Sequence, residues 1–136
     1  MLNNPNVQAF IEHVKSECKK HKPQLQLRPV KFLLLTGNIK CGGYFDSEER
    51  KLVVATKNED AWLGLLVHEY GHLTQWAEGC KEWEEGCEGI GHLEDWLAGK
   101  RKKNIKQHID KSRDLELDNE KRSVKLIKQW NLPIDI

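Results

Sequence analysis

The sequence predicts an α+β fold in a single domain, residues 1–136. Apolar residues recur at helical spacing near both ends of the chain and again in its middle. Between these segments, residues 30–55 hold short apolar runs separated by turn residues, which predict strands. The length, 136 residues, is enough to bury one core but too short for two. Helices combined with a small antiparallel or mixed sheet define the α+β class.

The first half of the chain predicts one helix followed by strands. From Asn6 to about His21 the apolar residues are spaced for an amphipathic helix, which Lys22-Pro23 ends. Residues 30–35 form a short apolar run before a turn and predict a strand. Residues 44–45 and 52–55, separated by a turn region, predict a β-hairpin.

A second helix is expected to begin in the segment Thr56-Lys57-Asn58-Glu59, which has the form of a capping box. At 100 degrees per residue, His72 and Glu69 fall within a broad apolar arc and His68 lies at its margin. The arc is formed by Trp62, Leu65, Leu66, Leu73 and Trp76. We therefore expect these polar residues to face the interior. Gly64 and Gly71 lie on the flank near His68, where a strand or substrate backbone is expected to come close.

The remaining part of the chain predicts an irregular insertion and a C-terminal helix. Residues 77–91 are rich in glutamate and glycine, and the stretch from residue 77 to the basic run at 100–103 is expected to form loops with one or two short helices. From about Ser112 to Trp130 the spacing is helical again, and Pro133 follows the end of the pattern. In this helix Glu116 and Glu120 are predicted in the middle of the apolar face, with Asp118 on the opposite, charged side.

Composition and charge exclude several classes of protein. The formal net charge is +1, so no overall field recruits nucleic acid or an anionic membrane. The basic run at 100–106 lacks interleaved aromatic residues for base stacking, which argues against nucleic-acid binding. The polar N-terminus lacks the features of a signal peptide, and no stretch is long and apolar enough for a membrane span. The sequence thus predicts a soluble cytoplasmic protein, with no membrane partner.

The four cysteines have no two-residue spacing of the kind found in zinc knuckles or thioredoxin-like sites. Reduced thiols are expected in the cytosol. Pairing of Cys80 with Cys87 is the alternative in an oxidising compartment.

The segment His68-Glu69-Tyr70-Gly71-His72 predicts a metal centre. Two histidines four residues apart on a helix share a face and can bind one Zn²⁺ ion, and Glu69 between them supplies a base. Buried carboxylates need a cation or hydrogen-bond partners, and a zinc ion held by His68 and His72 would be such a cation. One of Glu116 and Glu120 is therefore expected to be the third ligand. Three protein ligands leave the fourth position for water, as in catalytic zinc sites.

These two motifs resemble the gluzincin metallopeptidases, in which a ligand glutamate and a supporting acidic residue follow on a later helix. The small single-domain members, called minigluzincins, are most similar in size and order. The resemblance covers roughly residues 44–77 and 112–130. It implies that His68, His72 and Glu116 bind zinc, that Glu69 is the general base and that Glu120 supports an imidazole from outside the ligand shell. Glutamate at 120, where aspartate is commoner, leaves both assignments of the third ligand open.

The resemblance implies a zinc-dependent peptidase that hydrolyses peptide bonds, with peptide or protein substrates as partners. The strand at 52–55 resembles the edge strand on which such enzymes lay an extended substrate. His92, His108 and Tyr44 are candidates for stabilising the oxyanion, and Trp83 and Trp96 are candidates for lining a substrate groove. The alternative function is a non-catalytic or regulatory metal-binding domain that recognises a protein partner. Oligomeric state is left open by the sequence.

Overall fold

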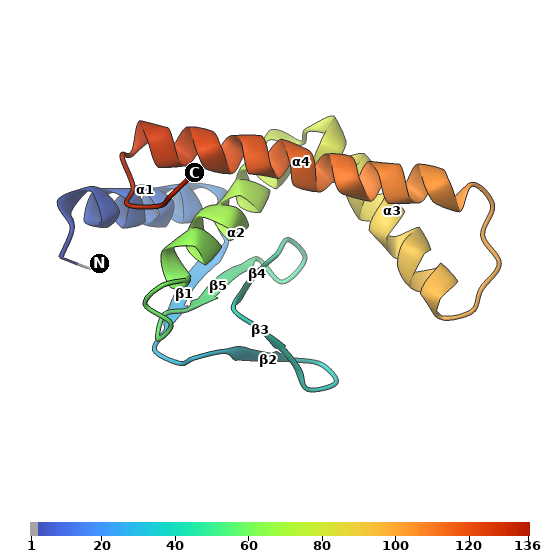
Figure 1. The fold of residues 1–136 in the computed structure, drawn as a ribbon, viewed down its shortest axis with the longest axis horizontal. Helices are drawn as coiled ribbons and strands as arrows, with labels where there is room; N and C mark the ends of the chain where they lie inside the picture. Colours follow the sequence, from blue (N-terminus) through green and yellow to red (C-terminus); the bar gives the residue numbers. More distant parts are fainter. Residues whose placement is uncertain (1–2) are drawn as a thin grey trace.

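The computed structural model describes residues 3–136, and this part of the chain folds into four helices and two small sheets (Figure 1). The α+β class is therefore confirmed. The elements, in chain order, are α1 (Pro5–His21), β1 (Gln24–Arg28), β2 (Leu33–Leu35), β3 (Ile39–Cys41), β4 (Gly43–Asp46), β5 (Lys51–Ala55), α2 (Trp62–Glu78), α3 (Lys81–Leu97) and α4 (Ile105–Gln129).

The larger sheet has the strand order β1-β5-β4. β4 and β5 form the antiparallel hairpin that the sequence predicted, and β1 pairs with β5 in parallel. β1 was not predicted, because its Gln-Leu-Gln-Leu-Arg run is short and its partner strand lies more than twenty residues away. β5 (52–55 in the prediction) lies in the centre of the sheet, so its expected role as an edge strand is wrong. β4 is the edge strand beside α2.

The apolar run at 30–35 is a strand only over Leu33–Leu35. This strand, β2, pairs with β3 in a separate two-stranded ribbon. The ribbon leaves several large apolar side chains exposed, Leu34 and Ile39 at 60% each.

Helix α1 confirms the first predicted helix. The side chain of Asn4 caps its N-terminus and accepts hydrogen bonds from the backbone N–H groups of Asn6 (2.9 Å) and Val7 (3.4 Å). Such a cap contributes about 1 kcal/mol. At the other end Lys22 adopts the left-handed conformation (φ 79°) and its N–H donates to the carbonyl of Cys18. The buried face of α1 packs in the same core as α2, which fixes one side of the helix that carries the histidines.

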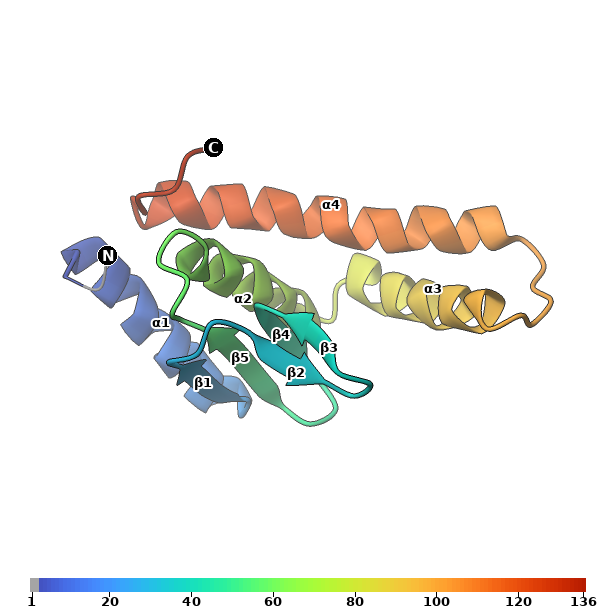
Figure 2. The ribbon, with the colours of Figure 1, turned by 60° about the horizontal axis from the view of Figure 1, so that its bottom comes forward.

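Helix α2 lies over the larger sheet and contacts α4 as well (Figure 2). Of the predicted apolar arc, Trp62, Leu66 and Leu73 are buried, while Leu65 and Trp76 are partly buried. This core is the frame that sets the position and direction of the histidine face. Within residues 3–136, no helix combines the length and the apolar content needed to cross a bilayer.

The predicted capping box at 56–59 is wrong. The Thr56 hydroxyl donates to the carbonyl of Arg28 at the end of β1 (3.0 Å) and does not cap a helix. The intervening residues form turns, and α2 begins only at Trp62, with no side-chain hydrogen bond at its N-cap, Ala61. Thr56 has a better partner in the parallel strand, which the local sequence pattern did not show.

The expected irregular insertion is also wrong, because α3 is one continuous helix of 17 residues that lies along α4 (Figure 2). Its glycines allow close packing. A Cβ on Gly86 would lie 2.5 Å from the Cβ of Leu115, and one on Gly89 would lie 2.8 Å from the carbonyl oxygen of His108. Glycine in this segment therefore marks the approach of two helices and not a break in one.

Helix α4 begins earlier than predicted, at Ile105, and its buried side differs from the expected one. Leu115 and Asn119, four residues apart, are its buried residues. Glu116 and Glu120 each follow one of these residues and are therefore turned 100 degrees from them about the helix axis. Both are exposed, and the Glu116 side chain is 51% exposed. The prediction that these carboxylates occupy the middle of a buried face is therefore wrong. The physical reason is that α4 packs against α3 with one part and against α2 with another, so a single apolar stripe does not describe it.

Candidate metal centre

Three of the predicted ligands come together between α2 and α4. The rings of His68 and His72 are one turn apart on α2, with centroids 4.8 Å from each other. Glu116 of α4 faces both of them: its carboxylate oxygens lie 3.7 Å from Nε2 of His68 and 3.5 Å from Nε2 of His72. One ligand atom from each residue lies within 4.8 Å of the other two.

These distances fit a tetrahedral metal ion. Zinc binds imidazole nitrogen and carboxylate oxygen at about 2.0–2.2 Å, so two ligand atoms on a tetrahedral zinc are about 3.4 Å apart. The two nitrogen-to-oxygen distances, 3.7 Å from His68 to Oε2 of Glu116 and 3.5 Å from His72 to Oε1, end on different carboxylate oxygens, and each is close to that separation. Two imidazoles and one carboxylate are also a donor set that zinc accepts. The residues present therefore fit the metal that the sequence predicted.

The centre is enclosed on one side and open on the other. The His72 side chain is only 12% exposed, while His68 and Glu116 are 45% and 51% exposed. Burial lowers the pKa of His72 more than its hydrogen bond to Gln75 and the charge of Glu116 raise it. Neutral imidazole is the form that binds metal. The open side leaves room for a fourth ligand from solvent or substrate.

Glu69 lies between this centre and the edge strand β4. Its Cγ is 3.4 Å from where a Cβ on Gly43 would be, so the strand backbone passes close to it. Burial, and secondly the negative charge of Glu116, raise the pKa of Glu69 to about 7, although a backbone hydrogen bond from Phe45 acts in the opposite direction. A carboxyl group with a pKa near neutral is suited to both accept and return a proton at physiological pH.

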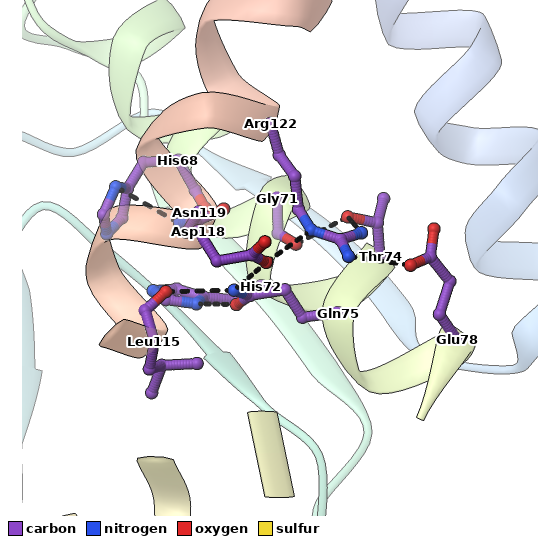
Figure 3. Close-up of polar contacts among 10 residues, drawn as sticks. All are labelled: His68, Gly71, His72, Thr74, Gln75, Glu78, Leu115, Asp118, Asn119 and Arg122. Atoms are coloured by element: carbon purple, nitrogen blue, oxygen red, sulfur yellow. Dashed lines mark hydrogen bonds and ion pairs between the residues drawn. The ribbon is translucent and has the colours of Figure 1, made fainter. Parts of the chain in front are cut away.

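Gln75 supports His72 from behind. Its side chain is fully buried, and Oε1 lies 2.8 Å from Nδ1 of His72 (Figure 3). Its amide nitrogen donates to the carbonyl of Leu115 (3.0 Å) and to Oδ2 of Asp118 (2.9 Å), both on α4. Sequence reasoning missed Gln75. The available signal was its position three residues after His72, on the helix face that also carries His68.

Asp118 is held by a cation from its own helix. Arg122 donates to Oδ2 of Asp118 at 2.7 Å and to Glu78 on α2, also at 2.7 Å (Figure 3). Burial acts to raise the pKa of Asp118, but the hydrogen bonds from Gln75 and Arg122 together with nearby positive charge give a net decrease. Asp118 was expected on the charged side of the helix opposite Glu116, and there it pairs with Arg122 and also links α4 to α2 through Gln75.

Asn119, not Glu120, is the α4 side chain that contacts His68 by hydrogen bonding. Its Nδ2 donates to the backbone carbonyl of His68 (2.9 Å) and lies 3.5 Å from the ring Nδ1 (Figure 3). Glu120 borders the same pocket as His68 and Glu116. Its role in supporting an imidazole stays a prediction.

The lack of a side chain at Gly71 makes room for Asn119, and not for the strand or substrate backbone that was expected there. A Cβ at position 71 would overlap Oδ1 of Asn119, whereas a Cβ on Gly64 would meet nothing within 4 Å. Gly71→Ala is expected to lower the free energy of unfolding by about 1–3 kcal/mol through overpacking. Gly64→Ala on the same helix is expected to raise it by up to about 1 kcal/mol, because alanine favours helix. Urea denaturation followed by circular dichroism measures both, and an equal effect of the two changes would contradict this role of Gly71.

The other candidate residues separate into two places. Tyr44 is on β4, next to Phe45, and Trp83 lies close to the centre, with its ring 6.0 Å from that of His72. His92 and His108 instead stack on each other between α3 and α4, with ring centroids 4.1 Å apart. Trp96 lies beside the basic loop that joins these helices. Trp83 is thus the candidate that the fold brings toward the metal centre, whereas the Tyr44 side chain packs with Leu33, Val53 and Ala55, on the face of the sheet opposite to that of Phe45.

A second group of possible ligands lies nearby, formed by Cys80, Glu82 and Asp118. The carboxylate of Asp118 is already bound to Arg122 and to Gln75. Since an arginine already balances this carboxylate, the histidine group is the stronger candidate for a metal centre. All four cysteines of the chain are free thiols.

Comparison of the chain with known protein families, with curated proteins and with solved structures found no match.

Proposed function

We propose that this chain is a zinc-dependent metallopeptidase of the gluzincin type. The observation that carries the proposal is the meeting of His68, His72 and Glu116, with carboxylate oxygens 3.7 and 3.5 Å from the two imidazole nitrogens, beside Glu69. A site that only held a metal would not need this partly buried carboxyl group between its histidines. The order of the motifs, a histidine helix followed by a glutamate helix, supports the same assignment.

The chemistry divides between the metal and Glu69. A bound zinc ion would lower the pKa of a coordinated water to about 7 and polarise a substrate carbonyl. Glu69 accepts the proton of the attacking water, holds it on its carboxyl group, and delivers it to the leaving nitrogen of the peptide bond. The hydrogen bond from the Phe45 backbone and the neighbouring Gly43 hold this carboxyl group beside β4.

The substrate is proposed to bind as an extended strand along β4. β4 is the edge strand that lies beside α2, and its Phe45 contacts Glu69 through the backbone. A groove at this edge is lined by Leu35, Phe45 and Trp83, among others. Backbone pairing at an open edge gives affinity, while the groove contacts side chains.

Metal content tests the proposal first, because it requires no knowledge of the substrate. Native mass spectrometry of protein purified without chelator is expected to give one zinc per chain. Cleavage of a mixture of unstructured peptides should then occur, stop when chelator is added, and return with added zinc. A folded chain that binds no zinc would refute the proposal. One zinc without cleavage of any peptide would favour the alternative, a non-catalytic metal-binding domain that recognises a partner.

A further inference from the structure

The side chain of Gln75 makes hydrogen bonds to both metal-binding helices. It is completely buried, and its bonds reach His72 on its own helix and Leu115 and Asp118 on α4. Leu115 immediately precedes the third ligand, Glu116. The buried amide of Gln75 therefore connects His72, one proposed ligand, to the α4 backbone next to Glu116, another proposed ligand.

The partners of Gln75 fix which way its amide points. The carbonyl of Leu115 can only accept, and the Asp118 carboxylate, which is paired with Arg122, also accepts. Both must therefore face the NH₂ group of Gln75. Its Oε1 is consequently the atom that faces His72, at 2.8 Å from Nδ1. Because an amide oxygen cannot donate, Nδ1 of His72 has to carry the hydrogen.

This orientation determines the tautomer of His72. In a neutral imidazole with hydrogen on Nδ1, the free lone pair is on Nε2. Nε2 is the atom that faces Glu116 at 3.5 Å. We propose that Gln75 is a positioning residue that holds His72 in its metal-binding tautomer before metal arrives and ties it to the helix of Glu116. The inference rests on the proposed metal site, but the tautomer itself is a property of the metal-free protein.

His68 provides an internal comparison. The group near its Nδ1 is the amide nitrogen of Asn119, at 3.5 Å, and that nitrogen already donates to the His68 carbonyl at 2.9 Å. A donor at this position does not favour hydrogen on Nδ1. The two histidines are therefore expected to differ in the metal-free protein. Gln75 fixes the tautomer of His72, whereas Asn119 does not fix the tautomer of His68.

Long-range ¹H–¹⁵N correlation NMR of the metal-free protein, at a pH where the imidazoles are neutral, tests the tautomer directly. The expected result for His72 is a protonated Nδ1 and a bare Nε2. Hydrogen on Nε2 of His72 would overturn the inference. In a Gln75→Met variant, which cannot accept this bond, the preference of His72 for Nδ1–H is expected to fall while the spectrum of His68 changes little.

Zinc affinity gives the second readout, by competition with a chromophoric chelator. Gln75→Met is expected to weaken zinc binding about 10- to 100-fold, the range found when partners of metal ligands are removed. Gln129→Met, at the exposed end of α4, is the matched control and should bind zinc as the wild type does. Unchanged affinity in a folded Gln75→Met variant would also overturn the inference.

The two proposals fail in different ways. If the wild type binds no zinc but His72 has its hydrogen on Nδ1, the metallopeptidase assignment fails and the role of Gln75 in setting the tautomer stands. If zinc binds and His72 has its hydrogen on Nε2 in the metal-free protein, the role of Gln75 fails and the metal site stands. Should Gln75→Met not fold, the tautomer in the wild type decides alone.

Discussion

Replacing Glu69 with glutamine is expected to lower the rate of peptide cleavage by about 10²- to 10⁴-fold, the usual contribution of a general acid–base group. Glutamine has nearly the same size but cannot take a proton from water. Zinc content should stay at one per chain, because the proposed ligands are His68, His72 and Glu116, and Glu69 is not among them. Cleavage rates with saturating zinc and native mass spectrometry of the same preparations measure the two properties separately.

Glu59→Gln is the control for this change. Glu59 is an exposed residue in the turn before α2, so the substitution makes the same change of charge without touching the centre. It should keep both zinc and activity. Wild-type activity in Glu69→Gln would refute the role of Glu69 as general base. Loss of zinc in that variant would instead place Glu69 among the groups that hold the metal.

The part of the candidate site that could be predicted from sequence is the part carried by one helix. His68, Glu69 and His72 lie within five residues, and their relative positions follow from the helical period alone. Glu116 could also be predicted, but for a partly incorrect reason. It was expected on a buried face and lies on a half-exposed one, yet it still reaches both histidines.

The partners behind the ligands could not be predicted, since they depend on how α2 and α4 pack. Gln75 and Asp118 are 43 residues apart, and nothing in the local pattern of either shows that they meet. Asn119 is one residue from the predicted Glu120, but a change of one position on a helix turns the side chain by 100 degrees. Gly71 shows the same limit. Its small size is explained only by an asparagine on another helix.

Glycine and short strands account for the errors in the fold. The glycines of α3 indicated loops because glycine is poor in isolated helices, whereas here Gly86 and Gly89 let α3 lie against α4. β1 was not predicted because it pairs in parallel with β5, a strand that is distant in the sequence. In both cases tertiary packing outweighs local propensity.

Glu116→Gln is expected to weaken zinc binding by more than about 100-fold, beyond the range for a residue that only supports a ligand. The reason is that one of its carboxylate oxygens lies 3.7 Å from Nε2 of His68 and the other lies 3.5 Å from Nε2 of His72, and an amide is a much poorer ligand. Because the side chain is half-exposed, the substitution should leave the thermal stability of the metal-free protein nearly unchanged. Zinc competition titrations and thermal melts of the metal-free variants measure these two properties.

Glu120→Gln is the matched variant, one turn along the same helix and bordering the same pocket. If Glu120 supports His68, this change should weaken zinc binding by no more than about 100-fold. The variant with the larger loss of zinc affinity identifies the third ligand, which the sequence left open between Glu116 and Glu120. A larger loss in Glu120→Gln than in Glu116→Gln would make Glu120 the third ligand. That result would require the centre to shift along α4 by four residues, about 6 Å, away from the position where Glu116 now faces His72.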